Sequence, residues 1–454
     1  MPRPSSQNEI VPGCSVRKSV FYDPCPPIYA LGPAVLYLRI RMSTRILVIL
    51  PRIPVPARDG AEVVMSETLS AFRRQGMDVD VFALNPSRQK RESKNLDPLC
   101  RAHAVAAVNT DVRLLPLATS LVHTPTVPVG GRTLPMSYWL LRFVDKHALN
   151  ALNQFVDRNG PYDIVHCETL FTVFYGLCLA GNTGQTKVVY RSHNVEWRIQ
   201  QQLSQEAGIN LLERAVRFRL AAQTKIYEER ISVLVDAIAC ISEQDRLWYS
   251  DASTQTPVRT MLPGMREYAV QEHERTSASI GFLGSLDWEP NRRGVEWFMQ
   301  KVWPIIRQHV PNAGFEIAGR GSSAFCESVN IPDGAVCIGE VDSIEEFYGR
   351  QALLVSPLFS GSGVRIKLLE SFACSKAVVT TSQGADGLHK GAENVCCVAD
   401  SPEQFAEACI HLLSNQDRRK QLGSAARTYV CEQYSWNTAV DDITNLYRQV
   451  LQRL

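Results

Sequence analysis

The sequence predicts an α/β protein of two halves, each with a doubly wound parallel sheet. Short apolar runs alternate with longer amphipathic stretches, which is typical of parallel sheets covered by helices. This alternation starts twice, first at 45–50 and again at 280–284. The polar segment 266–279 separates the two series. We therefore expect a hinge near 264–276 and a ligand site at the carboxyl ends of the strands.

The first half is predicted to begin with a strand, a loop and an amphipathic helix. That helix covers 61–75, with Gly76 at its C-terminal end. A long apolar helix is expected over 135–158, whereas the loop 85–135 has no readable pattern. With helices between them, further strands are expected over 79–83, 163–167, 187–191, 236–240 and 258–262.

The second half is predicted to continue in the same way after its first strand. Capping boxes at Asp342–Glu345 and Ser401–Gln404 mark two helix starts, the second with Pro402 in the first turn. An apolar stripe at helical spacing predicts a terminal helix from Tyr434 onward. Helices are also expected over 291–309 and 343–350, and strands over 314–318, 335–338 and 352–356.

The composition is that of an ordinary soluble globular protein. Of 454 residues, 45% are hydrophobic and 21% charged, and the net charge of +2 gives no case for a broad nucleic-acid surface. The thirteen cysteines include no Cys-x-x-Cys pair and no zinc pattern, so we expect buried, reduced thiols.

Residues 1–41 differ from the rest, because they are rich in Pro and Ser. Their one apolar run, 29–38, is too short to span a bilayer and lacks the flanks of a signal peptide. Met42 stands just before the first predicted strand. We expect 1–43 to be disordered, or to be an extension that translation from Met42 would omit.

The segment 356–380 is the most informative part of the chain. It reads as a strand, a glycine loop, a cationic helix start, a helix and a strand. The loop Gly361–Gly363 lets the backbone approach a phosphate, and Arg365 and Lys367 add positive charge there. Glu370 follows on the first turns of the helix, where it can accept hydrogen bonds from sugar hydroxyls. Phosphate and sugar together indicate a nucleotide-sugar.

These motifs resemble those of the retaining family-4 glycosyltransferases, in particular the branch of bacterial exopolysaccharide and sugar-transferase gene clusters. The resemblance covers roughly 44–454. It implies the GT-B fold, with the acceptor mainly on the N-terminal half and the nucleotide-sugar on the C-terminal half. The last helix would cross back to the first domain. The motifs that carry it are 51–56, 192–196, 284–294, 361–373, 376–381, 384–388 and 434–436.

The resemblance implies the domain boundaries and the residues of the site. The expected parts are the extension 1–43, the acceptor domain 44–265, the donor domain 276–433 and the helix 434–454. The expected catalytic residues are His193, Arg293 and Lys367. The expected donor-binding residues are Gly60, Val341, Gly361, Ser362, Gly363, Arg365, Leu369 and Glu370.

The chain departs from the family pattern at several positions. Relatives have a Glu where this chain has Ser362, so the motif does not identify the donor sugar. Many relatives also have a phosphate-binding Arg at the position of Ser285, so we expect Arg365 or Lys367 to supply that charge. Where relatives place a glycine pair, only Gly60 matches.

Structural roles are the alternatives for these residues. Glu370 could form a surface pair with Lys367, worth a few tenths of a kcal/mol. Arg293 could be a solvated helix-start arginine, and His193 a capped loop histidine. For His166, which lies mid-strand, we favour a satisfied structural role.

The predicted function is retaining transfer of a sugar from a nucleotide-diphosphate donor, as a UDP- or GDP-sugar, to a glycan or lipid-linked hydroxyl in polysaccharide biosynthesis. No metal or other cofactor is expected, because no Asp-x-Asp pair lies on a suitable loop. The expected location is the cytoplasm, with peripheral contact to the inner face of the membrane through 139–146 and 214–219 as an alternative. A two-Rossmann nucleotide-sugar epimerase and a degenerate, non-catalytic binding module are the competing functions.

Overall fold

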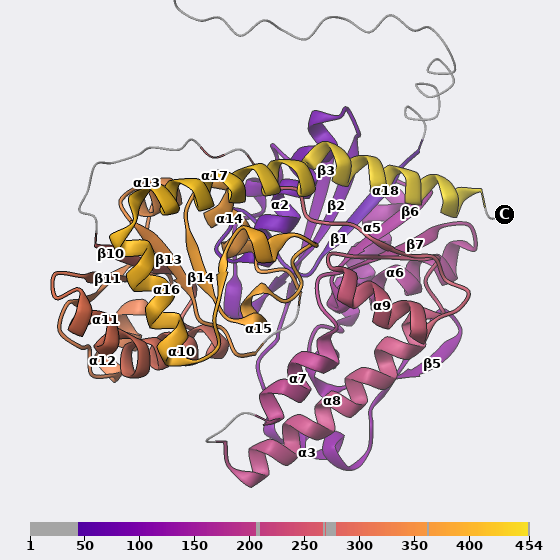
Figure 1. The fold of residues 1–454 in the computed structure, drawn as a ribbon. Coiled ribbons are helices and arrows are strands. Elements are labelled where there is room, and N and C mark those ends of the chain that lie inside the picture. Colours follow the sequence, from indigo (N-terminus) through magenta and orange to yellow (C-terminus); the bar gives the residue numbers. More distant parts are fainter. Residues whose placement is uncertain (1–43, 206–208, 267, 269–277, 361–362, 453–454) are drawn as a thin grey trace, which may run out of the picture. The chain divides into compact units, whose positions relative to one another are not determined.

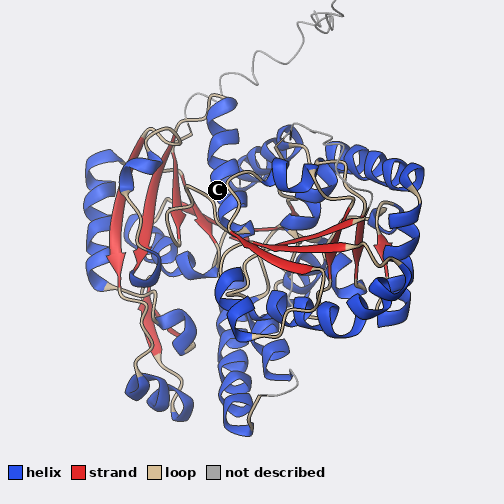
Figure 2. Ribbon diagram, turned by 90° about the vertical axis from the view of Figure 1, so that its left-hand side faces the viewer, coloured by secondary structure: helices blue, strands red, loops and turns tan. Residues whose placement is uncertain are grey.

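The computed structural model describes residues 44–205, 209–266, 268, 278–360 and 363–452. The expectations for 1–43 and for Gly361 and Ser362 therefore lie outside the described residues. Two parallel sheets with helices on their faces form the fold, so the predicted α/β class is confirmed (Figure 1, Figure 2).

The first sheet has seven strands in the order β3-β2-β1-β6-β7-β8-β9. All five residues of the interior strand β1 are buried, as expected for a parallel strand with helices on both faces. The strands are β1 (Ile46–Leu50), β2 (Val79–Pro86), β3 (Ala102–Val108), β6 (Ile164–Glu168), β7 (Lys187–Ser192), β8 (Ala237–Cys240) and β9 (Val258–Thr260). The accompanying helices are α2 (Gly60–Arg74), α3 (Leu114–Val122), α4 (Tyr138–Leu141), α5 (Lys146–Asn159), α6 (Leu170–Thr183), α7 (Glu196–Gln205), α8 (Leu211–Ser232) and α9 (Glu243–Ala252).

The second sheet has six strands in the order β12-β11-β10-β13-β14-β15. The strands are β10 (Ser279–Leu283), β11 (Gly314–Ala318), β12 (Ala335–Gly339), β13 (Leu353–Ser356), β14 (Val378–Thr380) and β15 (Cys397–Val398). Its helices are α10 (Glu289–Trp297), α11 (Trp303–His309), α12 (Ser322–Ser328), α13 (Ile344–Gly349), α14 (Ile366–Ala373), α15 (Ser382–Ala385), α16 (Pro402–Ser414) and α17 (Gln416–Gln433).

The terminal helix α18 (Trp436–Leu451) packs on the first half. Its apolar stripe, including Val440, Ile443 and Leu446, joins the core cluster that contains the buried β1 side chains Ile46 and Val48. The last helix thus crosses back to the first sheet, as the resemblance implied.

The prediction of one long helix over 135–158 is wrong, because the structure has two separate helices there, α4 and α5. The side chain of Asp145 accepts a hydrogen bond from the Ala148 amide at 2.9 Å and starts α5 as its N-cap. The helix expected over 291–309 is present: α10, a π-helical stretch at Phe298–Val302 and α11 follow one another without a gap. An internal cap and a π turn are both invisible to apolar periodicity.

Two capping predictions have different outcomes. Ser401 caps α16 by accepting a hydrogen bond from the Gln404 amide, with Pro402 next, as predicted. The cap of α13 lies one residue later than predicted: Ser343, rather than Asp342, accepts from the Glu346 amide at 3.2 Å.

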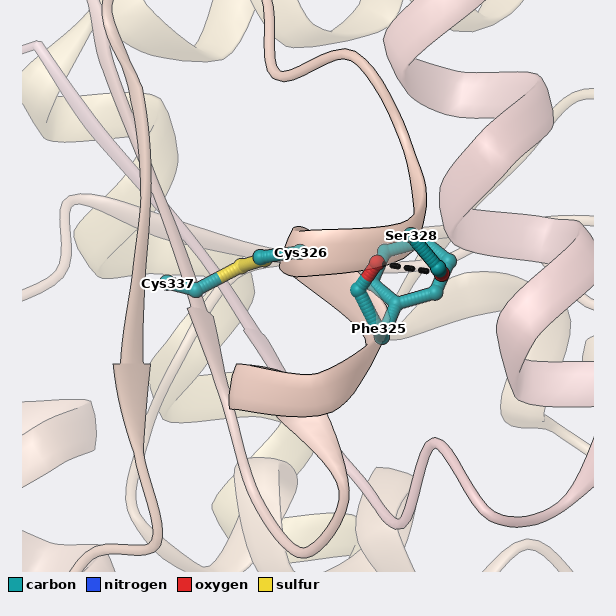
Figure 3. The surroundings of a disulfide bond; sticks show 4 residues. All are labelled: Phe325, Cys326, Ser328 and Cys337. Atoms are coloured by element: carbon teal, nitrogen blue, oxygen red, sulfur yellow. Dashed lines mark hydrogen bonds between the residues drawn. A yellow bond between two sulfur atoms is a disulfide. The ribbon is translucent and has the colours of Figure 1, made fainter.

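The sequence analysis expected reduced thiols throughout, and for two of the cysteines this expectation is wrong. Cys326 of α12 and Cys337 of β12 are joined by a disulfide, with Cα atoms 6.4 Å apart (Figure 3). In the same turn of α12 the Ser328 hydroxyl donates to the Phe325 carbonyl at 2.7 Å (Figure 3). The bridge therefore ties a short helix to an edge strand of the second sheet.

Candidate functional site

The candidate site starts where β13 leads into α14. Gly363 has φ +77°, in the left-handed region that favours glycine. A Cβ atom on Gly363 would lie 2.5 Å from Asn194 Oδ1 and 2.7 Å from the His193 carbonyl oxygen. The loop before α14 thus lies directly against the loop after β7, and two of the predicted site positions, Gly363 and His193, come together.

Two cationic side chains follow at the start of α14. Arg365 is only 6% exposed, and burial lowers its pKa to about 10 while Asp386 and Asp245 act in the opposite direction. Burial, and then the charge of Arg365, lowers the pKa of Lys367 to about 7. A buried and a half-buried cation whose charges act on each other form a site that an anion would stabilise.

Lys367 is held by neighbours from the second half. Its Nζ donates to Asn291 Oδ1 at 2.6 Å and lies 4.8 Å from the centre of the Phe282 ring. The Asn291 amide in turn donates to the Ser285 carbonyl oxygen at 2.8 Å. Asn291 therefore fixes the ammonium group, a role that no sequence pattern indicated.

Glu370 lies on α14, half-buried, and does not pair with Lys367. Its Oε1 accepts a hydrogen bond from the Tyr268 hydroxyl at 3.3 Å. Burial raises the pKa of Glu370 to about 7, although Tyr268 and Arg266 act to lower it. Between Glu370 and Lys367, both described, there is no ion pair, so the surface-pair alternative is wrong.

Arg293 lies on α10 beside the loop that follows β13. A Cβ on its neighbour Gly294 would be 1.8 Å from the Pro357 carbonyl oxygen, so α10 and this loop are in tight contact. The Nε of Arg293 is 2.8 Å from Glu289 Oε1, which is an i,i+4 pair. The structure thus places α10 against the loop at Pro357, and Arg293 pairs with an acid of its own helix.

A further cation, Arg320, contacts Ser285, where many relatives have an arginine. Its Nη2 donates to Ser285 Oγ at 3.2 Å and its Nε to Asp287 Oδ2 at 2.8 Å. Sequence reasoning assigned that missing charge to Arg365 or Lys367 and overlooked Arg320, because Arg320 reaches Ser285 from a different strand end.

His193 rests on a buried polar cluster at the strand ends of the first half. Its Nε2 is 2.5 Å from Glu168 Oε2, and Arg191 Nη1 is 3.5 Å from Glu168 Oε1. The side chains of Glu168 and Arg191 are each 1% exposed. Burial acts to raise the pKa of Glu168, but Arg191, His166 and His193 outweigh it and hold the pKa well below its usual value.

The same cluster reaches the terminal helix. His166 Nε2 is 3.1 Å from Glu168 Oε1, and His166 Nδ1 is 2.8 Å from the Tyr447 hydroxyl on α18. His166 thus has partners on both nitrogens, in keeping with the structural role favoured for it. Glu168 was missed by sequence reasoning; a charged residue ending a buried apolar strand was the available signal.

Two of the expected donor-binding positions, Gly60 and Leu369, lie against α14 or on it, and Val341 packs on the core cluster that contains Leu369. Gly60 begins α2, and a Cβ there would lie 3.0 Å from Ile366 Cγ1. Leu369 is fully buried in a core cluster, against which Val341 packs half-buried. The Leu369 side chain is therefore a core residue, and only its backbone is left to meet a ligand.

The comparisons with known proteins agree with this architecture. The model "Glycosyltransferase Family 4" matches residues 58–260, and "Glycosyl transferases group 1" matches 277–415. An uncharacterized 44.6 kDa protein of the cps region of Klebsiella pneumoniae is 20% identical over 407 residues, which are 86% of this chain and 96% of that protein.

Solved structures share the fold. Sucrose-phosphate synthase from Thermosynechococcus elongatus superposes with a TM-score of 0.66 at 15% identity, covering 90% of this chain and 100% of the other. HepE of Anabaena, solved with UDP and glucose, gives a TM-score of 0.58 at 12% identity, covering 90% and 99%.

Two parallel sheets covered by helices and a terminal helix that returns to the first sheet form the GT-B fold. Together the two matched regions account for most of both halves. The chain belongs to the family-4 glycosyltransferases.

Proposed function

We propose that this chain is a retaining, metal-independent glycosyltransferase. It transfers a sugar from a UDP- or GDP-sugar to a hydroxyl of a glycan or lipid-linked acceptor in polysaccharide biosynthesis. The observation that carries this proposal is the pair of cations at the start of α14, buried Arg365 and half-buried Lys367, about one turn before the half-buried carboxylate of Glu370. The cps-region relative and the UDP in the HepE structure support the substrate class.

The donor diphosphate would bind at the start of α14. Backbone N–H groups of the helix start, Arg365 and Lys367 supply positive potential there, which stabilises the charge that develops as the diphosphate leaves. Glu370 would accept hydrogen bonds from the ribose hydroxyls, with Tyr268 fixing one carboxylate oxygen at 3.3 Å.

His193 would face the donor sugar across the glycine loop. Its carbonyl oxygen lies against Gly363, and Glu168 anchors its ring. Glu168 is a positioning residue, because it acts on the sugar through His193. The acceptor hydroxyl would then attack from the face that the diphosphate leaves, which retains the anomeric configuration.

Donor binding and stereochemistry test the proposal separately. A thermal-shift screen with UDP-, GDP- and ADP-sugars identifies the donor, and NMR of the product with an acceptor panel reports the anomeric configuration. We expect one donor class to stabilise the protein, and the product to keep the donor configuration with EDTA present. An inverted product would refute the retaining mechanism; loss of turnover in EDTA, restored by Mn²⁺, would refute metal independence; donor binding without turnover would support a non-catalytic binding module.

A further inference from the structure

The amide group of Asn291 is held in one orientation within the second half. Asn291 lies in the first turn of α10 and is only 5% exposed. Its Nδ2 donates a hydrogen bond to the Ser285 carbonyl oxygen at 2.8 Å. Because a carbonyl oxygen can only accept, the nitrogen of the amide must face Ser285, and the oxygen Oδ1 must face Lys367.

The loop that carries Ser285 is itself fixed by the neighbouring strand end. The Gly284 amide donates to the Ala318 carbonyl at 3.0 Å, and the Leu286 amide donates to the Arg320 carbonyl at 2.7 Å. The Arg320 side chain also donates to Ser285 Oγ at 3.2 Å. The loops after β10 and β11 therefore hold the carbonyl group that orients Asn291.

The contacts of Lys367 leave its charge unneutralised. Its Nζ donates to Asn291 Oδ1 at 2.6 Å and lies 4.8 Å from the centre of the Phe282 ring. No ion pair joins Lys367 to any acid that the structure describes. A carboxylate at position 291 would cancel the charge of an ammonium group, whereas an amide oxygen accepts its hydrogen bond and leaves the charge in place.

The charged groups on the surrounding elements do not supply that missing counter-charge. Arg365, two residues earlier, acts on Lys367 as a like charge. The acids on α14, on α10 and on the loop after β10 each have another partner. These pairs are Glu370 with Tyr268, Glu289 with Arg293, and Asp287 with Arg320.

We propose that Asn291 is a positioning residue of the donor site. Its oriented amide holds Lys367 Nζ at the start of α14 and leaves the charge of the lysine to the departing diphosphate. This role rests on the proposed function, because it requires a diphosphate at α14. The role also requires a neutral residue at 291, since an acid there would hold the lysine but compete with the diphosphate for its charge.

The variant Asn291→Asp tests this requirement. Calorimetric titration of the full chain with UDP, GDP and ADP gives the dissociation constant, and two buffers at pH 8 give the protons taken up. We expect Asn291→Asp to weaken binding of the diphosphate by at least about tenfold. Proton uptake should disappear, because the new carboxylate keeps Lys367 charged before the ligand arrives.

A second variant, Asn291→Ala, removes the hydrogen bond without adding an acid. It is expected to weaken binding by about ten- to a hundredfold, which is the usual loss for a hydrogen bond to a charged group. Proton uptake should persist in Asn291→Ala, because nothing charges Lys367 in the free protein. A residue that only supported the fold would not separate the two variants in this way.

The ionisation of Lys367 in the free protein gives a readout that needs no ligand. NMR of ¹³C-labelled lysine measures it, with the signal of Lys367 assigned through Lys367→Arg. Burial, and then Arg365, lowers the pKa of Lys367 to about 7 in the wild type. Asn291→Asp is expected to raise this pKa to above about 8, because an opposite charge at hydrogen-bond distance favours the charged form.

A matched control is Asn85→Asp in the first half. Asn85 also holds a loop through both ends of its amide: Nδ2 donates to the Arg91 carbonyl at 2.9 Å, and Oδ1 accepts from the Arg91 amide at 3.0 Å. We expect this control to leave both the pKa of Lys367 and the affinity for the diphosphate as in the wild type.

Two results would overturn the role of Asn291. One is a pKa of Lys367 and a proton uptake that stay unchanged in Asn291→Asp. The other is an Asn291→Asp or Asn291→Ala variant that binds the diphosphate as tightly as the wild type does. A wild type that binds none of the three nucleotides would instead contradict the proposed function, and the NMR titration would still decide whether residue 291 controls the charge of Lys367.

Discussion

Glu168 is the shared partner of three buried side chains, His193, His166 and Arg191. Its two oxygens meet His193 at 2.5 Å and His166 at 3.1 Å, with Arg191 at 3.5 Å. Arg191 also donates to the Thr68 hydroxyl at 2.6 Å, but Glu168 is the acid that balances its charge. A neutral residue at 168 would leave this guanidinium buried without a counter-charge.

Glu168→Gln is therefore expected to lower stability strongly. Removing one partner of a buried ion pair typically costs about 3–5 kcal/mol. Urea unfolding measures the change. Asp111→Asn is the control, because it removes an acid whose pair with Arg88 is more than half exposed, and such a pair is worth at most about 1 kcal/mol. A cost below that of the control would contradict the role assigned to Glu168.

Glu370→Gln is expected to weaken donor binding by about ten- to a hundredfold, since hydrogen bonds to a charged group are worth about 1.5–3 kcal/mol. Calorimetric titration of the donor nucleotide gives the dissociation constant. Glu345→Gln, which changes an acid on α13 whose charge also bears on Glu370, serves as the control and should bind nearly as the wild type does. Equal affinity of the Glu370→Gln variant and the wild type would rule out a ribose contact.

Proton uptake should accompany donor binding near pH 8. The pKa of Lys367 is lowered to about 7 by burial, so the free protein holds this amine mostly neutral at that pH. A bound diphosphate favours the charged form and raises the pKa, so a proton is taken up. Titration in two buffers of different ionisation enthalpy measures it, and Lys367→Arg, which stays charged, should abolish it. Proton release, or uptake unchanged in that variant, would count against the assignment.

At the scale of elements, the strand, loop and helix around α14 agree with the sequence prediction. β13, α14 and β14 lie where 356–380 predicted them, because glycine, cations and apolar runs are local signals. The partners of that helix could not be predicted. Tyr268, Asn291 and Arg320 reach the site from other segments, and their contacts depend on how the chain folds rather than on spacing.

Gly363→Ala is expected to lower stability by about 1–3 kcal/mol, since a side chain would have to adopt φ +77° and displace the loop at His193. Thermal unfolding with and without donor measures both stability and affinity. Gly314→Ala is the matched control: it has no positive φ, and its Cβ would have nothing within 4 Å. If the two variants unfold alike, the close approach of the two loops is not present in solution.

At the scale of the whole molecule, the alternation of apolar runs was sufficient to predict two parallel sheets. The elements within 85–135 could not be predicted in this way, because β3 is alanine-rich and only partly buried. A small antiparallel pair, β4 (Thr126–Val129) and β5 (Arg132–Pro135), follows β3. Exposure of α3 also contradicts the usual burial of apolar helices. Only the structure could show that Leu114 and Leu115 of this helix are exposed.

The terminal helix α18 makes a side-chain hydrogen bond to a strand of the first sheet, in addition to its apolar packing. The Tyr447 hydroxyl meets His166 at 2.8 Å, within the cluster that holds His193. The apolar stripe of α18 predicted its burial, whereas this hydrogen bond could not be predicted, because it joins residues 281 positions apart.

The central claim is that the start of α14 binds a nucleotide diphosphate through its cations. The most direct measurement compares the thermal shift of the wild type and of Arg365→Gln/Lys367→Gln with UDP-, GDP- and ADP-sugars. A donor at about 100 times its dissociation constant should stabilise the wild type by about 2.7 kcal/mol, and the variant should lose that shift while remaining folded. A wild type that no nucleotide-sugar stabilises, or a variant that is stabilised equally, would contradict the claim.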